Sequence, residues 1–394
     1  MLSERQAAAQ KPYGWPVLRL GFRPFYLGAA ALAAIWVPLW LAIFLAGLPL
    51  PTTVPGLFWH AHEMLFGFAV AVIVGFLMTA GKNWTGLATP RGPWLAALVL
   101  LWLAGRWAAF SGSALLYGLL DVALLVLVAG ILIRLLLRAR NFRNLPLAGL
   151  LVLLALTNAC FHLAAHGQIA MSPLTPLHAA LALVLMIESV IGGRVIPAFT
   201  MAAKPGLKLL RQPRLEWVTF GMTALALAWW VFAPAGWPGA WALGAAGLLH
   251  LRRFLGWQPQ SSARQPMLWI LHAAYAWFPL GLVLLALAQV GVLPDSVGVH
   301  ALAVGFTGGL IVGMMTRTAR GHTGRTLLAD RSEVLAYGLI LLAAVLRVLL
   351  PLVLPAFTST VLVLAGMAWS LAFVVYLGRF SPWLLQTRLD GQDG

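Results

Sequence analysis

The sequence predicts an all-α integral membrane protein, because of its composition and the spacing of its apolar runs. Of the 394 residues, 61% are hydrophobic and only 9% are charged, whereas a water-soluble protein carries roughly 25% charged residues. Each membrane-spanning helix needs about 20 apolar residues, so the composition is sufficient for roughly twelve spans and leaves little for a soluble domain. A soluble globular fold is therefore excluded.

Twelve apolar runs follow one another along the chain, separated by turn sequences such as Gly47-Leu48-Pro49 and Pro234-Ala235-Gly236. The first run is too long for the apolar core of a cleaved signal peptide, so we interpret it as a retained span. Together the runs predict one polytopic domain over residues 1–394. They cover residues 25–47, 60–80, 94–110, 114–137, 146–167, 175–197, 216–233, 237–251, 267–292, 298–316, 334–351 and 355–378.

The basic residues predict the orientation of these spans. Of the 26 Lys and Arg residues, all but Arg106 and Arg347 fall before the first span, in every second connection or after the last span. Lys and Arg are retained on the cytoplasmic side, so we expect both termini, residues 1–24 and 380–394, to be cytoplasmic tails. The net charge of +16 is then mainly a topology signal, and nucleic acid is not expected as a partner.

Six of the nine histidines are expected at one depth, on the outer side of the membrane. A single such histidine is commonly hydrogen-bonded to a backbone carbonyl, but polar residues in spans are costly and usually face partners inside a bundle. A cluster of imidazoles with one cysteine in the whole chain suits copper, zinc or haem iron. The six are His60, His62, His162, His166, His178 and His300.

The spacing within this group separates two kinds of pair. His162 and His166 are four residues apart, which places both imidazoles on one helix face, where they can share a metal. His60 and His62 project about 200° apart on a helix and are expected to serve different centres. Cys160 stands alone, which excludes an internal disulfide and a cysteine-bound iron–sulfur cluster.

An internal repeat is also expected. Aligning His62 with His300 matches Gly67 with Gly305 and the sequence starting at Ile73 with that starting at Ile311. His178 begins a third, weaker copy. The spacing predicts three pseudo-equivalent four-helix units, residues 1–140, 141–255 and 256–394, as in haem-copper oxidases.

These residues resemble the NnrS family, the haem- and copper-containing bacterial membrane proteins associated with nitric oxide. The resemblance runs from residue 20 to residue 325. It is carried by the segments Leu20-Gly21-Phe22-Arg23-Pro24-Phe25, Trp59-His60-Ala61-His62-Glu63-Met64, Asn83-Trp84-Thr85-Gly86, Gly193-Arg194-Val195-Ile196-Pro197, His272 with Tyr275 and Trp277, and Gly313-Met314 followed by Arg317 and Arg320-Gly321-His322-Thr323-Gly324-Arg325.

The resemblance implies non-covalent b-type haem, copper, a bacterial inner-membrane location and a role in relieving nitrosative stress. We expect copper at His162, His166 and His178, since three histidines leave a position open for substrate. His60, His62 and His300 are then the haem candidates. Arg106 and Arg347 are the two arginines that do not fall on the predicted cytoplasmic side. We expect them to pair with haem propionates or to reach the lipid headgroups on the outer side. An adjacent His-His pair and a His-Pro-Glu-Val-Tyr segment are absent from the sequence, so ligands cannot be carried over from the oxidases.

Buried carboxylates are candidates for catalysis and proton delivery. Glu63 and Glu188 are the two we favour, because an ionisable group in hydrocarbon is expensive unless paired or hydrated. Glu63 also suits the orientation of an imidazole, and Glu188 suits an ion pair with Arg194. Asp121 is a third candidate for proton delivery, with simple solvation as the alternative because it is nearer the outer end of its span.

The sequence is compatible with three functions. The first is an oxidoreductase, similar to a nitric oxide reductase, that takes electrons from a quinol or a protein donor. The second is a protein that binds or senses nitric oxide or another diatomic ligand without turnover. The third is a twelve-span transporter. His250, His272 and His322 fall on the cytoplasmic side and their roles stay open. The resemblance leaves His272 a candidate ligand or quinol contact.

Overall fold

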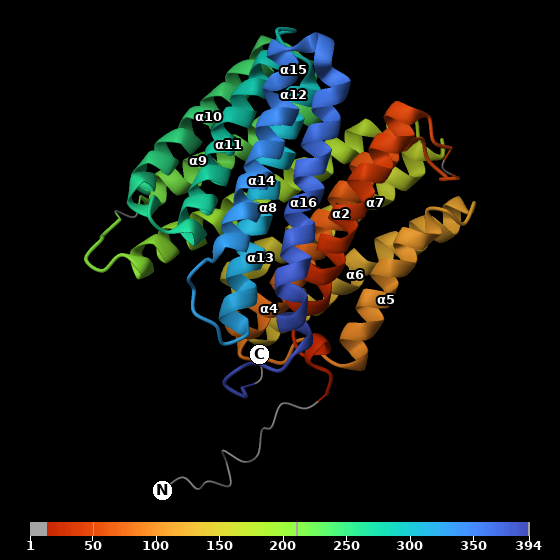
Figure 1. Ribbon diagram of the computed structural model, residues 1–394. Coiled ribbons are helices and arrows are strands. Elements are labelled where there is room, and N and C mark those ends of the chain that lie inside the picture. The colour runs from red at the N-terminus through yellow and green to blue at the C-terminus, as the bar shows by residue number, and fades with distance from the viewer. Residues whose placement is uncertain (1–13, 50, 210–211, 393–394) are drawn as a thin grey trace, which may run out of the picture.

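The structure is a computed structural model that describes residues 14–49, 51–209 and 212–392 (Figure 1). Within these residues the regular secondary structure is helical, and strands are absent from them. The long helices are α2 (Phe22–Ala46), α4 (Val70–Thr85), α5 (Pro93–Ala108), α6 (Ala114–Arg138), α7 (Leu145–Ala165), α8 (Leu174–Ala203), α9 (Pro213–Phe232), α10 (Trp237–Gly256), α11 (Pro266–Gln289), α13 (Gly309–His322), α14 (Arg331–Val348) and α16 (Thr358–Leu385).

Shorter helical pieces precede or extend these helices. Two of them, η3 and η6, are π-helices that join α3 to α4 and α12 to α13 without a break. The short pieces are η2 (Pro16–Leu18), α3 (Gly56–His62), η3 (Glu63–Ala69), η4 (Phe142–Asn144), η5 (Pro259–Ser262), α12 (Asp295–His300), η6 (Ala301–Gly308), α15 (Leu350–Val353) and η7 (Pro355–Phe357).

The all-α membrane fold is confirmed. Each predicted apolar run overlaps a helical segment, and 10 segments in the described residues are long and apolar enough to cross a membrane. Two runs fall outside that set: α5 has only 16 residues, and α10 carries His250, Arg252 and Arg253 in its last turns. The count of twelve spans therefore stays a prediction.

Glycines end several helices where the sequence placed a turn. Gly47 follows α2 with φ 68° and Gly86 follows α4 with φ 69°, a left-handed conformation that glycine adopts without steric cost. At the other end of the chain, α16 runs on to Leu385. The helix thus takes up the first residues of the predicted tail 380–394, whereas residues 1–13 of the predicted tail 1–24 lie outside the described residues.

Three helical segments form the centre of the bundle, and each is the second of a predicted unit. The most apolar stretches of Gly56–Thr85 and Asp295–His322 are 83% and 72% buried, and those of α8 and α11 are each 67% buried, against 22% in α2 and 28% in α9. Gly56–Thr85, α8 and Asp295–His322 also line one common cavity. Around them, α6 contacts α7, α10 contacts α11, and α16 returns to contact α2. Successive groups of four helices are therefore joined in a ring around three inner segments.

Two features of the structure agree with the predicted repeat. Each of the aligned histidines, His62 and His300, is followed immediately by a π-helix, a rare element that often marks functional positions. The matched glycines Gly75 and Gly313 also have equivalent neighbours. A Cβ at Gly75 would contact Phe25 and Phe22 of α2, and one at Gly313 would contact Leu271 and Ile270 of α11, so each glycine lets the first helix of its unit approach closely.

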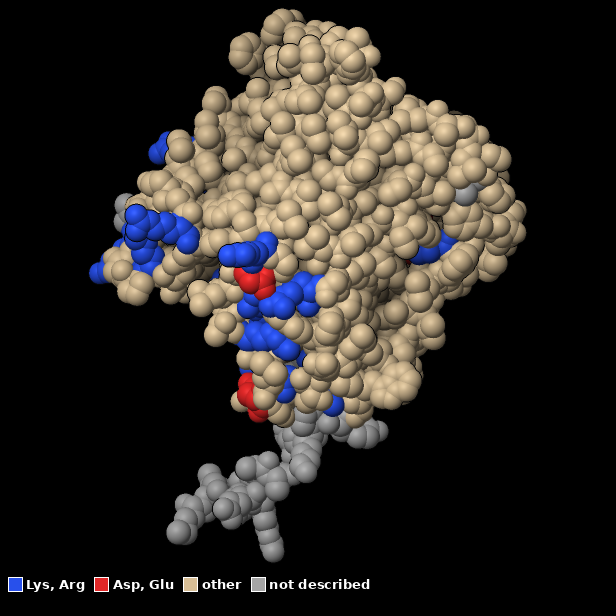
Figure 2. Space-filling view, viewed as in Figure 1, with Lys and Arg blue, Asp and Glu red and all other residues tan. Residues whose placement is uncertain are grey.

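The charges are unevenly distributed over the molecule. Figure 2 shows Lys and Arg gathered over the lower part of the view, and the first and last described residues lie at the same end in Figure 1. The upper surface in this view is almost free of charged residues. The multi-pass architecture agrees with the predicted location, while the inner membrane and the cytoplasmic position of the termini remain predictions.

Candidate metal centre

Three buried side chains from three helices converge near the end of the bundle opposite the termini. His62 ends α3, Asp121 lies in the first half of α6, and His162 lies in the last turn of α7. His62 Nε2 is 3.0 Å from Asp121 Oδ2, and His162 Nε2 is 3.1 Å from the same oxygen. Among the described residues, this is the group of His, Cys, Asp or Glu whose donor atoms lie within 4.8 Å of one another.

These separations match those between ligands that share one metal ion. Donor atoms about 2.0–2.1 Å from a tetrahedral metal lie about 3.3 Å from each other. Two imidazoles and one carboxylate suit copper, zinc or iron and leave a coordination position open, as in catalytic sites. The donor set therefore fits a transition metal.

The charge of the cluster also favours a cation. Arg106, on α5, pairs with Glu63 Oε1 and with Asp121 Oδ1. All three side chains are at most 5% exposed, so they are little screened by water. With both imidazoles neutral, two carboxylates and one guanidinium leave one net negative charge. A metal cation at His62, Asp121 and His162 would compensate it.

Neighbouring side chains hold the first two donors in position. The Tyr117 hydroxyl lies 2.9 Å from His62 Nδ1 and 3.2 Å from Glu63 Oε1. Asn158 donates from Nδ2 to Asp121 Oδ2 at 2.8 Å, and its Oδ1 lies 3.0 Å from His62 Nε2. Metal-binding histidines commonly use their second nitrogen, here the Nδ1 of His62 beside Tyr117, in a contact that fixes the orientation of the ring.

Local backbone features make this packing possible. The π-helix η3 begins at Glu63, directly after His62, so the carboxylate and the imidazole lie side by side with His62 Nδ1 3.4 Å from Glu63 Oε1. A Cβ at Gly67 would lie 2.9 Å from Glu63 Oε2 and 3.2 Å from Arg106 Nη1. A Cβ at Gly105 would lie 3.3 Å from the Asp121 Cα. The two glycines therefore leave room for the ion pairs.

The expected copper set is only partly brought together. His166 stacks on His162 with ring centroids 6.5 Å apart and an angle of 8° between the rings, as the four-residue spacing predicted. His166 Nδ1 bonds to the His162 carbonyl at 2.8 Å, and Nε2 is buried without a hydrogen-bond partner. His178 instead stacks on Trp230 of α9 and is not in the converging group.

The expected haem set is divided in a similar way. His62 belongs to the group with Asp121, whereas His60 packs edge-on against Trp40 of α2, with centroids 5.0 Å apart. His60 and His62 thus have different neighbours, while their predicted service of two different centres stays a prediction. His60 lies close enough to His300 and Arg347 to interact with them electrostatically.

This second cluster has donors that a haem could use. The His300 Nδ1 bonds to the Ser296 carbonyl at 2.7 Å, which leaves Nε2 for another ligand, and His60 Nδ1 is buried without a hydrogen-bond partner. None of the ion pairs found among the described residues includes Arg347. Arg106 differs, because Glu63 and Asp121 are its counter-charges. We correct its expected role from a propionate partner to a residue that positions the two carboxylates.

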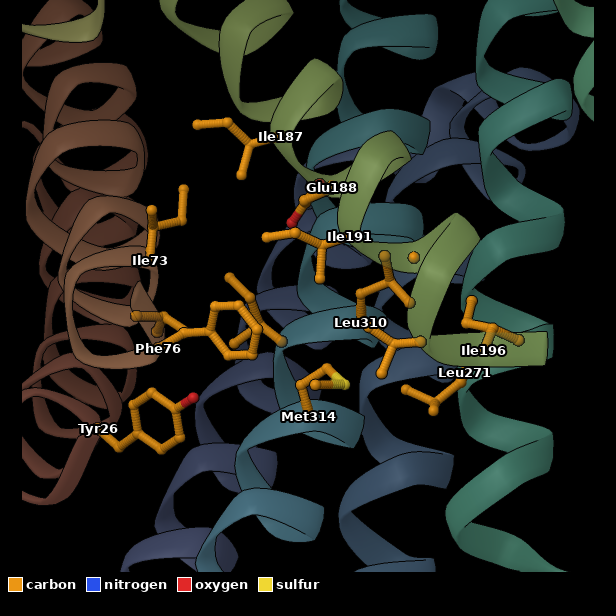
Figure 3. Close-up of a pocket in the computed structure, with 14 residues that line it drawn as sticks. Tyr26, Ile73, Phe76, Ile187, Glu188, Ile191, Ile196, Leu271, Leu310 and Met314 are labelled. Carbon is orange, nitrogen blue, oxygen red and sulfur yellow. The ribbon is translucent and has the colours of Figure 1, made fainter. Parts of the chain in front are cut away.

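Glu188 faces a cavity in the centre of the bundle (Figure 3). The cavity has a volume of about 70 Å³ and is lined almost entirely by apolar side chains of the inner helices, together with Tyr26 of α2. Thr307 of η6 donates to Glu188 Oε2 at 2.7 Å. The expected ion pair with Arg194 is wrong, since Arg194 donates to Asn144 Oδ1 at 2.8 Å and lies further along α8.

Sequence reasoning did not assign Asp121, Tyr117 and Asn158 to the site. Asp121 is 5% exposed and not solvated, because Arg106, Asn158 and the two imidazoles surround it. The available signal was a carboxylate inside the apolar run 114–137, with an asparagine four residues before His162. Which helix faces would meet could not be read from that signal.

The other three histidines have hydrogen-bond or ring partners of their own. His250 Nδ1 lies 2.7 Å from the Tyr275 hydroxyl, and His272 Nε2 lies 3.0 Å from Thr200 Oγ1. The His322 ring lies against Phe22, with centroids 5.4 Å apart. These positions explain the three residues as packing partners between helices.

The fold and the site together define a multi-span helical membrane protein with a buried histidine–carboxylate group suited to a transition metal. Residues 16–388 match the model of the NnrS family, described as NnrS protein. Because the match covers nearly the whole chain, the protein belongs to the NnrS family and is a nitric-oxide-associated membrane protein. No curated protein matches the chain.

Proposed function

We propose that this protein binds copper at His62, Asp121 and His162 and relieves nitrosative stress by reducing nitric oxide. The proposal depends on one observation: two imidazoles and a carboxylate converge on a common point while buried in an apolar bundle. A buried, hydrogen-bonded group of this kind is costly to maintain for packing alone. Copper held there would bind nitric oxide and exchange electrons with it.

Haem is the second cofactor of the proposal, with His60 and His300 as its candidate ligands. The buried Nδ1 of His60 and the carbonyl-bonded Nδ1 of His300 support this assignment. Arg347, which interacts electrostatically with His60, would neutralise a propionate. We place the protein in the bacterial inner membrane, with the basic face and both termini in the cytoplasm.

The remaining residues have roles in charge and proton balance. Reduction of two nitric oxide molecules to nitrous oxide and water consumes two electrons and two protons, so protons must reach the buried site. Tyr117 joins His62 to Glu63 by hydrogen bonds, and it can pass a proton between His62 Nδ1 and the carboxylate. Arg106 pairs with Glu63 and with Asp121 and supplies the positive charge that faces both carboxyl groups. A quinol or a protein donor supplies the electrons.

Metal analysis with an optical spectrum tests the cofactor assignment. The purified protein is expected to contain copper and a haem absorption that shifts on reduction. Asp121→Asn and His162→Ala should lose copper, while His178→Ala, which removes an imidazole outside the converging group, should keep it. A colourless, metal-free wild type would refute the proposal and favour a transporter.

Anaerobic nitric oxide consumption then tests the reaction. With an artificial reductant, the wild type should remove nitric oxide continuously and produce nitrous oxide, and Asp121→Asn should not. Removal of only one equivalent per metal centre would contradict turnover and identify a binding or sensing protein.

A further inference from the structure

A groove on the lipid-facing surface lies between α5 and α6, away from the metal centre. It has a volume of about 700 Å³. Its wall consists of apolar residues along most of its length and two arginines at one end. The lining residues on α6 are Leu127, Ile131, Arg134, Leu135 and Arg138.

The packing of the two helices explains where the groove forms. Near the outer end, Gly105 of α5 lies directly against the backbone of Asp121 on α6. The groove is lined instead by the opening turns of α5 and the closing turns of α6, together with Ala88 and Pro90 from the segment before α5. The helices are thus in close contact at the metal centre and enclose a hollow at their other ends.

The length of the hollow corresponds to one leaflet of a bilayer. From Leu127 to Arg138 the helix rises roughly 17 Å, and the hydrocarbon of one leaflet is roughly 15 Å deep. Arg134 and Arg138 lie at the end with most of the basic residues, and Trp94, which is 77% exposed, stands opposite them on α5. Tryptophan is typical of the membrane–water interface.

The charge at this end is positive and accessible. Arg134 and Arg138 are both exposed and, being four residues apart, project from the same face of α6. The ion pairs found in the described residues include neither of them. Two guanidinium groups therefore lie at the interface, next to an apolar hollow that is as deep as one leaflet. This combination is complementary to a phospholipid, which carries a phosphate attached to acyl chains.

We propose that this groove is a binding site for one anionic phospholipid of the cytoplasmic leaflet. The phosphate is held by Arg134 and Arg138, and an acyl chain lies along Leu98, Leu101, Leu127 and Ile131. The site does not depend on the metal centre or on the proposed reaction.

Native mass spectrometry of the purified full-length protein tests this site, with phosphatidylglycerol and phosphatidylcholine of identical acyl chains as probes. The wild type should retain one phosphatidylglycerol in preference to phosphatidylcholine. Arg134→Gln with Arg138→Gln should weaken that retention by roughly 30-fold, at about fivefold for each arginine. The matched control, Arg214→Gln with Arg252→Gln, removes two other exposed arginines and should retain the lipid.

A second variant tests the apolar part of the groove separately from its two arginines. Ile131→Trp fills the hollow without changing a charge and should reduce the retention of both lipids. Equal retention of phosphatidylglycerol by the Arg134/Arg138 variant and its control would overturn the proposal. So would full retention by Ile131→Trp, or a quinone in place of phospholipid in an organic extract of the wild-type protein.

Discussion

His62 Nε2 and Asp121 Oδ2 lie 3.0 Å apart although they belong to different membrane helices. His162 completes the group from a third helix, so the site exists only where α3, α6 and α7 meet. The surrounding residues Glu63, Arg106 and Tyr117 then decide its charge and the orientation of its donors.

Tyr117→Phe should lower copper affinity by about 10–100-fold, the range seen when a residue that orients a ligand is lost. The aromatic ring remains in the core, so the fold should be kept. Competitive titration with a copper chelator measures the effect. Tyr376→Phe is the control, because it removes a buried hydroxyl on α16 that is outside the site. Equal losses in the two variants would contradict a specific role for Tyr117.

Arg106→Met should destabilise the protein by about 3–5 kcal/mol, because it leaves Glu63 and Asp121 buried without their counter-charge. Thermal unfolding in detergent measures the change. Adding Glu63→Gln and Asp121→Asn to Arg106→Met removes both charges and should recover part of the stability, although not the metal. A triple variant less stable than Arg106→Met would show that the carboxylates are not the source of the loss.

Gly67→Ala should cost about 1–3 kcal/mol, since the new Cβ would push Glu63 and Arg106 out of their packed positions. Gly130→Ala is the matched control on α6. A Cβ there meets nothing within 4 Å, so it should be neutral or stabilise the helix by about 0.5–1 kcal/mol. Melting temperatures of the two variants give the comparison, and equal shifts would argue against crowding at Gly67.

The first turn of α14 should be sensitive to acid. Partial burial favours the neutral form of Asp330, but hydrogen bonds from Ser332 and Glu333 and the nearby Arg379 outweigh it, and the pKa of this carboxyl lies below its ordinary value. A carboxyl whose pKa is lower in the folded state stabilises the fold above its unfolded pKa of about 3.9, and that contribution disappears as the pH falls through the folded pKa.

Hydrogen exchange at Ser332 and Glu333 measures this effect. Both backbone N–H groups point at Asp330 Oδ1, so their protection should fall as the pH is lowered below about 4. Asp330→Asn keeps a capping oxygen that does not titrate and should show no such fall. A similar pH dependence in the variant would assign the effect to another group.

Part of the site was predictable because its signals are local. His62 and His162 were expected as metal ligands from their depth, and Glu63 from its place beside His62. His60 and His62 were expected to serve different centres, because the angle between residues two apart on a helix is fixed. The partners of these residues lie on other helices, and neither Asp121 nor Arg106 was placed correctly.

The sequence by itself determined that the chain is a helical membrane protein and which residues are polar within it. Composition and run length are sufficient for this, because the bilayer imposes one thickness and one solvent on every span. Only the tertiary structure decided that His62 and His162 share Asp121 while His178 stacks on Trp230. The physical reason is that rotation of each helix about its axis is set by packing against its neighbours, and glycines such as Gly67 and Gly105 determine how close those neighbours come.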